Sequence, residues 1–152
     1  MEGILLSVHV LAGILFVGPS AVAASLFPRF APVAVGAPAP SRRPAERNES
    51  VARMLHRITR VYGILGIAVP TVGLTLALVQ GRMGEIWITI AMVLTAVAGG
   101  LLALQIYPRQ RSALALPDDG RQLRRLGMLA GIFNLLWATV VVLMIVRPGA
   151  DR

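Results

Sequence analysis

The sequence contains no cysteine and no lysine, and only 14% of its 152 residues are charged. Without cysteine the chain cannot hold a disulfide, a thiolate metal site, an iron–sulfur cluster or a cysteine nucleophile. It also lacks an HExxH motif, a phosphate-cradling glycine loop, a paired-carboxylate site and a plausible Ser–His–Asp set. These absences remove the usual grounds for a hydrolase or nucleotidase, so we favour a protein that is not an enzyme.

Long apolar runs make up most of the chain, in which 56% of residues are hydrophobic. Four runs are each long enough to cross a bilayer, which takes about 20 residues. Backbone groups in hydrocarbon must pair within their own segment, so these runs are expected to be helices. The sequence predicts an all-α, single-domain polytopic membrane protein, a four-transmembrane-helix bundle over residues 1–152 with spans near Gly3–Phe27, Ile58–Gln80, Glu85–Tyr107 and Leu126–Val146.

The arginines are distributed unevenly between the connections. Twelve of the fifteen flank or fill the first and third connections, and three lie in the second connection and the C-terminal tail. The positive-inside rule therefore predicts that both basic connections are cytoplasmic and that both termini are extracytoplasmic, in the inner (plasma) membrane. The net charge of +8 is explained by this sorting, so no nucleic-acid partner is expected. A signal-peptide cleavage site at Ala21–Ser25 is the alternative for the first run, but no arginine precedes it.

The first connection, residues 28–50, is rich in proline and arginine and is predicted to be an extended cytoplasmic linker. Asn48 or Ser50 is suited to cap a helix that continues into the second span. Three arginines at helical spacing on that extension are predicted to contact anionic lipid headgroups: Arg53, Arg57 and Arg60. Ligand binding by these arginines is the alternative.

Small residues mark where membrane helices approach closely, and each span has one such stripe. The predicted packing positions are Gly13 and Ser20 in the first span, Gly63, Gly66, Pro70 and Gly73 in the second, Met92, Ala96, Gly99 and Ala103 in the third, and Gly127, Gly131, Asn134 and Ala138 in the fourth. Pro19 and Pro70 are expected to kink their helices. The Asn134 amide is predicted to bond across the bundle, with a substrate contact as the alternative.

The two histidines are expected at opposite ends of the bundle. His9 lies in the first span, where a polar side chain is a functional candidate by default. It could bind a cofactor such as haem b, or bond within the bundle. His56 is expected at the cytoplasmic end of the second span as an interfacial structural residue, so the two cannot share one metal within a chain.

The opening pattern of His9, Phe16, Gly18 and "LFPR" at Leu26–Arg29 resembles the first helix of a group of small membrane proteins. The group includes the CopD-type copper-resistance membrane domain, HemJ-type protoporphyrinogen oxidases and uncharacterised four-helix integral membrane families of actinobacteria. The later spans look most like these actinobacterial families. The resemblance implies haem binding at His9, although Phe16 stands where HemJ-type proteins tend to have tryptophan and their lysine has no counterpart.

These observations favour a non-enzymatic accessory or packing subunit of a membrane assembly. Its partners would be the lipid bilayer and either another membrane protein or a second copy of the chain. The alternative function is a b-type haem-binding redox protein that uses His9.

Overall fold

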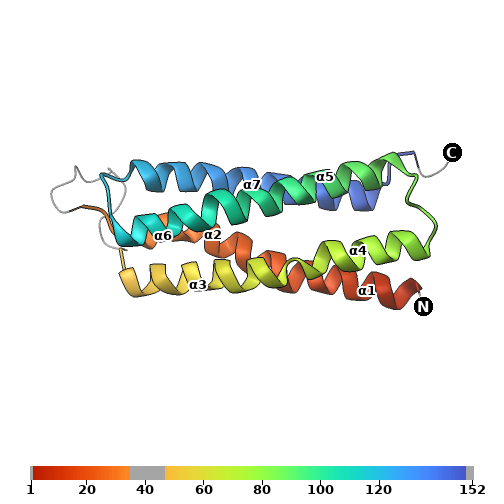
Figure 1. Ribbon diagram of the computed structural model, residues 1–152, viewed down its shortest axis with the longest axis horizontal. Helices are drawn as coiled ribbons and strands as arrows, with labels where there is room; N and C mark the ends of the chain where they lie inside the picture. Colours follow the sequence, from red (N-terminus) through yellow and green to blue (C-terminus); the bar gives the residue numbers. More distant parts are fainter. Residues whose placement is uncertain (1, 35–46, 150–152) are drawn as a thin grey trace.

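The computed structural model describes residues 2–34 and 47–149, which form four helical rods and contain no strand (Figure 1). Three rods are divided and the fourth is continuous. The first rod comprises α1 (Glu2–Ala12), a π-helical turn (Gly13–Val17) and α2 (Gly18–Phe30); the second, α3 (Glu49–Leu65) and α4 (Ala68–Val79); the third, α5 (Ile86–Gly100), a π-helical segment (Leu101–Ile106) and α6 (Tyr107–Ala115); the fourth, α7 (Arg121–Val146).

All four rods are long and apolar enough to cross a membrane, at 28, 31, 30 and 26 residues. At 1.5 Å per residue the shortest is about 39 Å long, more than the roughly 30 Å of a hydrocarbon core. No more than 28% of the most apolar stretch of any rod is buried, so most apolar side chains face outward, as they would toward lipid. The prediction of an all-helical protein with four candidate spans is confirmed.

Proline explains why three rods are divided. The π-helical turn ends two residues before Pro19, a break at Gly66–Ile67 precedes Pro70, and the second π-helical segment ends two residues before Pro108. Proline has no N–H to donate and its ring crowds the carbonyl four residues earlier, so the preceding turn widens or breaks. The α7 helix contains no proline and runs uninterrupted for 26 residues.

Large buried side chains close one half of the bundle. Phe27, Ile106, Leu126 and Phe133 are each no more than 2% exposed and belong to a single core cluster. This closed half consists of α2, α3, residues 101–115 and residues 121–133, and it ends at the first and third connections. Four helices meet there around one continuous core.

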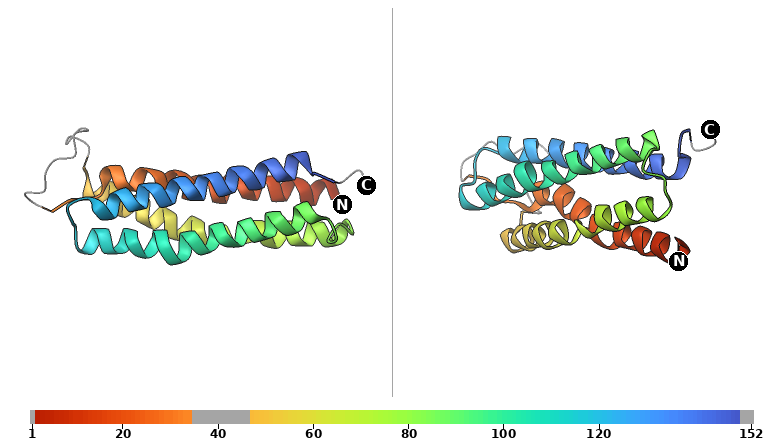
Figure 2. Two further views of the ribbon diagram at one scale, coloured as in Figure 1. Left: turned by 90° about the horizontal axis from the view of Figure 1, so that it is seen from above. Right: turned by 45° about the vertical axis from the view of Figure 1, so that its right-hand side comes forward.

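The other half of the bundle is open. Here α1 packs on α4 and α5 packs on the second part of α7, while only a few contacts join α4 to α5 (Figures 1 and 2). The open half thus consists of two helix pairs: α1 with α4, and α5 with residues 134–146. The beginning of α1 and the end of α7 lie at this end of the molecule.

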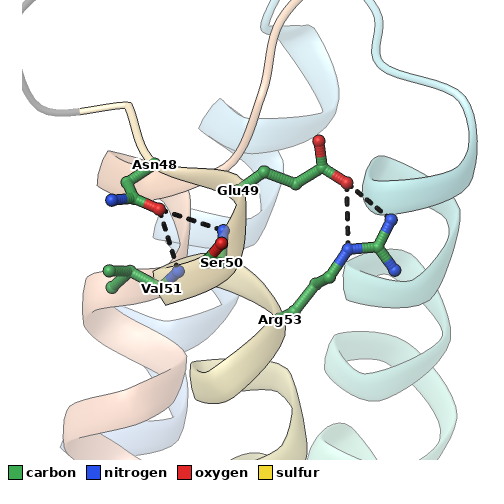
Figure 3. Close-up of polar contacts among 5 residues, drawn as sticks. All are labelled: Asn48, Glu49, Ser50, Val51 and Arg53. Atoms are coloured by element: carbon green, nitrogen blue, oxygen red, sulfur yellow. Dashed lines mark hydrogen bonds and ion pairs between the residues drawn. The ribbon is translucent and has the colours of Figure 1, made fainter.

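The first connection is anchored at both of its described ends. The Asn48 side chain accepts hydrogen bonds from the backbone N–H groups of Ser50 (3.0 Å) and Val51 (3.2 Å), which caps α3 as predicted (Figure 3). The backbone N–H of Asn48 donates to the Phe30 carbonyl at 3.0 Å, and that of Ala34 to the Asp118 carbonyl at 2.9 Å. Residues 35–46 of the predicted proline-rich linker lie outside the described residues.

Candidate functional sites

His9 is buried between α1 and α4, with 8% of its surface exposed. A Cβ added to Gly73 would lie 2.7 Å from His9 Cε1, 3.2 Å from Nδ1 and 3.5 Å from Nε2. The edge of the ring that carries both nitrogens therefore faces the backbone of α4, and only glycine leaves room for it. Among the described residues, Nδ1 has no hydrogen-bond partner.

This arrangement does not fit a haem ligand. An axial histidine presents one ring nitrogen to an open position beside the macrocycle, whereas both nitrogens of His9 lie on the ring edge that faces Gly73 of α4. A haem at His9 would require α1 to separate from α4. His9 instead packs against Gly73 at the contact between α1 and α4.

The small-residue stripes of the first and second rods are partly used for packing. Ser20 is 2% exposed and its hydroxyl donates to the Val17 carbonyl at 2.8 Å. A Cβ on Gly63 would lie 3.0 Å from Leu102 Cδ2, so Gly63 contacts the third rod directly. The added Cβ of Gly66 would meet only the backbone of its own helix, that of Gly13 would meet no atom within 4 Å, and Pro70 is exposed.

The stripes predicted in the third and fourth rods lie outside the bundle. In the third rod Ala91, Ala98 and Leu102 are buried, whereas Met92, Ala96, Gly99 and Ala103 are exposed. In α7 the buried residues are Leu123, Leu126, Ala130, Phe133 and Val140. Gly127 and Gly131 are exposed, and a Cβ added to either would meet no atom within 4 Å. Expecting these two glycines at contacts within the bundle was wrong, because large side chains and alanine fill those contacts.

Asn134 lies on the same outer face of α7 and joins α7 to α2. Its Nδ2 donates to Ser25 Oγ at 2.9 Å, and the Ser25 hydroxyl donates to the Ala21 carbonyl at 2.8 Å. The cross-helix bond expected of Asn134 is present, with a hydroxyl as its acceptor. The side chain is nevertheless exposed, and Ser25 is its single hydrogen-bond partner among the described residues.

A basic groove lies between α3 and α6 at the connection end of the closed half. It consists of two adjoining hollows of about 220 and 480 Å³, which share Arg53, His56 and Leu114. The remaining lining residues are Met54, Arg57, Arg111 and Ala115. Arg53 pairs with Glu49, with Nε 2.9 Å and Nη2 2.5 Å from Oε1 (Figure 3). Arg60 is also exposed but does not line the groove.

A hydrogen-bonded network fixes the His56 side chain beside the groove. Thr59 Oγ1 donates to the Leu55 carbonyl at 3.0 Å, and Gln110 Nε2 donates to Thr59 Oγ1 at 3.3 Å. This leaves Gln110 Oε1 to accept from His56 Nδ1 at 3.1 Å. Gln110 and Thr59 are fully buried, and the His56 ring stacks on Tyr107 at 4.8 Å. Sequence reasoning identified Arg53 and Arg57 but missed Gln110 and Arg111, because their proximity to α3 depends on how the third rod packs.

The turn between α4 and α5 holds a second polar cluster. Glu85 accepts hydrogen bonds from Arg82 and from the Trp87 indole N–H, with 3.2 Å between Arg82 Nη2 and Glu85 Oε2. The Arg82 guanidinium, followed by the Trp87 indole, holds the pKa of the Glu85 carboxyl below its ordinary value. These hydrogen bonds stabilise the turn of the α4–α5 hairpin and hold Trp87 near the beginning of the third rod.

Comparison with known proteins adds no relationship: neither a family model, nor a curated protein, nor a solved structure matches the chain. The resemblance to CopD-type and HemJ-type proteins therefore stays a prediction.

Proposed function

We propose that this protein is a non-enzymatic packing subunit of the plasma membrane, which pairs through the outer face of α7 with a second copy of itself. Four residues define this α7 face: Gly127, Gly131, Asn134 and Ala138. All four are exposed, and a helical period of 3.6 residues brings them within about 60° of arc. The observation that carries the proposal is that a Cβ added to either glycine would meet no atom of the described residues within 4 Å.

Polar chemistry favours pairing at this face over exposure to lipid. Asn134 lies near the middle of α7, where no water is present to satisfy its amide. Ser25 takes one N–H, which leaves an N–H and the carbonyl oxygen of the amide for another partner. A second Asn134 related by a two-fold axis supplies the matching donor and acceptor.

Membrane insertion favours a symmetric contact. Copies that share one topology place their α7 helices parallel, so a two-fold axis along the membrane normal brings the α7 face against itself. Glycines four residues apart allow two helix backbones to approach closely, and interhelical amide bonds add about 0.6 kcal/mol each. The proposal includes the topology predicted from arginine placement, with the first and third connections in the cytoplasm.

Association in lipid vesicles tests this proposal. We expect energy transfer between donor- and acceptor-labelled copies to increase with the protein-to-lipid ratio. Gly131→Leu should weaken self-association about tenfold, because a leucine side chain keeps the backbones apart. Gly99→Leu is the matched control, since Gly99 is an equally open glycine on α5 and should leave association unchanged.

Two results would contradict the proposal. One is a monomer at all protein-to-lipid ratios, and the other is an equal effect of Gly131→Leu and Gly99→Leu. Reporter fusions test the topology separately: fusions in residues 35–46 should report the cytoplasm, and fusions at the C-terminus the opposite side.

A further inference from the structure

We infer that the groove between α3 and α6 binds the phosphate group of an anionic phospholipid headgroup. This inference is independent of self-association through α7. Three guanidinium groups line the groove from two helices, Arg53 and Arg57 from α3 and Arg111 from α6. Guanidinium groups from two directions suit the oxygens of a phosphate, which accept charge-assisted hydrogen bonds.

The charge of the groove is largely uncompensated by the described residues. Within residues 2–34 and 47–149, Glu49 is the only carboxylate paired with a groove arginine, and its partner is Arg53. Arg57 and Arg111 carry no ion pair in that part of the chain, and each lines one of the two adjoining hollows, Arg57 on α3 and Arg111 on α6. A bound anion would relieve the repulsion between these like charges.

The buried network determines which nitrogen His56 offers. The Leu55 carbonyl can only accept, so Thr59 donates to it and must accept from the Gln110 amide. Gln110 then presents its oxygen, and His56 must carry a proton on Nδ1 to donate to it. Nε2 takes no part in this network, and stacking on Tyr107 restricts the ring to this orientation.

The position and apolar lining of the groove favour a lipid over free phosphate. Met54 and Leu114 line the same hollows as the guanidinium groups, so a ligand with both phosphate and hydrocarbon parts matches the surface. Arg57 directly precedes the apolar run of the second rod, and Arg111 follows that of the third by four residues. The groove therefore lies at the level where a spanning bundle meets headgroups.

Native mass spectrometry of the full chain in detergent, with phosphatidylglycerol added, tests the inference. The wild-type protein should bind phosphatidylglycerol at least tenfold more tightly than zwitterionic phosphatidylcholine. The double variant Arg57→Gln/Arg111→Gln should lose about 30-fold in phosphatidylglycerol affinity, the loss expected for two basic contacts at a membrane surface. The matched control is Arg124→Gln/Arg125→Gln, which removes the same charge from exposed positions outside the groove and should change affinity less than twofold.

Three outcomes would overturn the inference. Equal losses in the two double variants would show that net charge, not the groove, attracts the lipid. Equal affinity for phosphatidylcholine and phosphatidylglycerol would exclude recognition of the anionic headgroup. Displacement of the lipid by millimolar inorganic phosphate would show a free-anion site. Unchanged thermal unfolding of both variants without added lipid establishes that they fold, and Arg57→Lys/Arg111→Lys, which keeps the charge, should recover most of the affinity.

Discussion

The closed and open halves of the bundle are built from the same four rods but hold together differently. In the closed half, Phe27, Ile106, Leu126 and Phe133 fill one core between four helices. In the open half the helices meet in two pairs, and α1 is held to α4 where the His9 ring lies against Gly73. In this bundle, aromatic and branched aliphatic side chains pack four helices around one core. Glycines instead allow one helix to approach another closely at single positions.

The same comparison explains why α7 has a free glycine face. In the closed half α7 turns Leu126 and Phe133 inward, which directs Gly127 and Gly131 outward. Glycines that contact a neighbour do so opposite one large side chain, as Gly63 does with Leu102. Among the described residues, the two glycines of the α7 face have no such neighbour, and Asn134 contacts α2 through Ser25.

The largest expected effect is in the closed half. Phe27→Ala should lower the free energy of unfolding by about 3 kcal/mol, because it leaves a cavity among fully buried residues. Ile14→Ala, at a residue that is 64% exposed, should cost less than about 0.5 kcal/mol. Unfolding of both variants by denaturing detergent in mixed micelles provides the measurement. If both substitutions lower the free energy of unfolding equally, core and lipid-facing positions do not differ in the way described.

The next effect is in the open half. Gly73→Ala should destabilise the protein by about 2 kcal/mol, because the new Cβ would lie 2.7 Å from His9 Cε1. Gly99→Ala places a methyl group in open space and should be neutral or slightly stabilising. Combining Gly73→Ala with His9→Ala should recover part of the loss. If Gly73→Ala behaves like Gly99→Ala, the described contact between α1 and α4 is wrong.

A smaller effect is expected from the polar network of the closed half. Gln110→Leu should cost about 1 kcal/mol, because it leaves His56 Nδ1 without an acceptor while Thr59 keeps its bond to Leu55. Tyr107→Leu tests the stacking contact by the same unfolding assay and should also shift the His56 ring resonances. A network without structural importance would leave both the stability and the spectrum unchanged.

The smallest effect is expected at the α4–α5 turn. Since the pKa of Glu85 is lowered by Arg82 and Trp87, its carboxylate stabilises the folded state fully above the unfolded pKa of about 4.3. That stabilisation is lost as the pH falls through the lower folded pKa. The small difference in thermal stability between wild type and Glu85→Gln at pH 7 should therefore shrink below about pH 4. If the stability difference between wild type and Glu85→Gln grows as the pH falls, the bonds of Glu85 to Arg82 and Trp87 do not stabilise the folded state.

Sequence reasoning was most successful where one physical rule dominates. The length and hydropathy of the apolar runs predicted the four rods, and the capping residue Asn48 predicted the start of α3. The predicted third span ends at Tyr107, whereas the third rod continues to Ala115. This extension carries polar residues beyond the apolar run, so hydropathy alone could not include it.

The packing faces were harder to predict, for a physical reason. Small size identifies residues that allow close approach, but it does not say whether the approaching helix belongs to the same chain. Gly63 and Gly73 have neighbours in the bundle, whereas Gly127 and Gly131 do not. The basic groove was missed for a related reason, since Arg111 and Gln110 lie more than 50 residues from His56 in sequence.

The α7 face is tested most directly by cysteine crosslinking in native membranes, since the wild-type chain contains no cysteine. Single cysteines are placed in turn at residues 127–138 and oxidised. Self-association through the α7 face predicts disulfide-linked dimers that are most abundant at 127, 131, 134 and 138, and sparse at Ile132, which is 42% exposed on another side of the helix. Uniform crosslinking, or a maximum at Ile132, would contradict it.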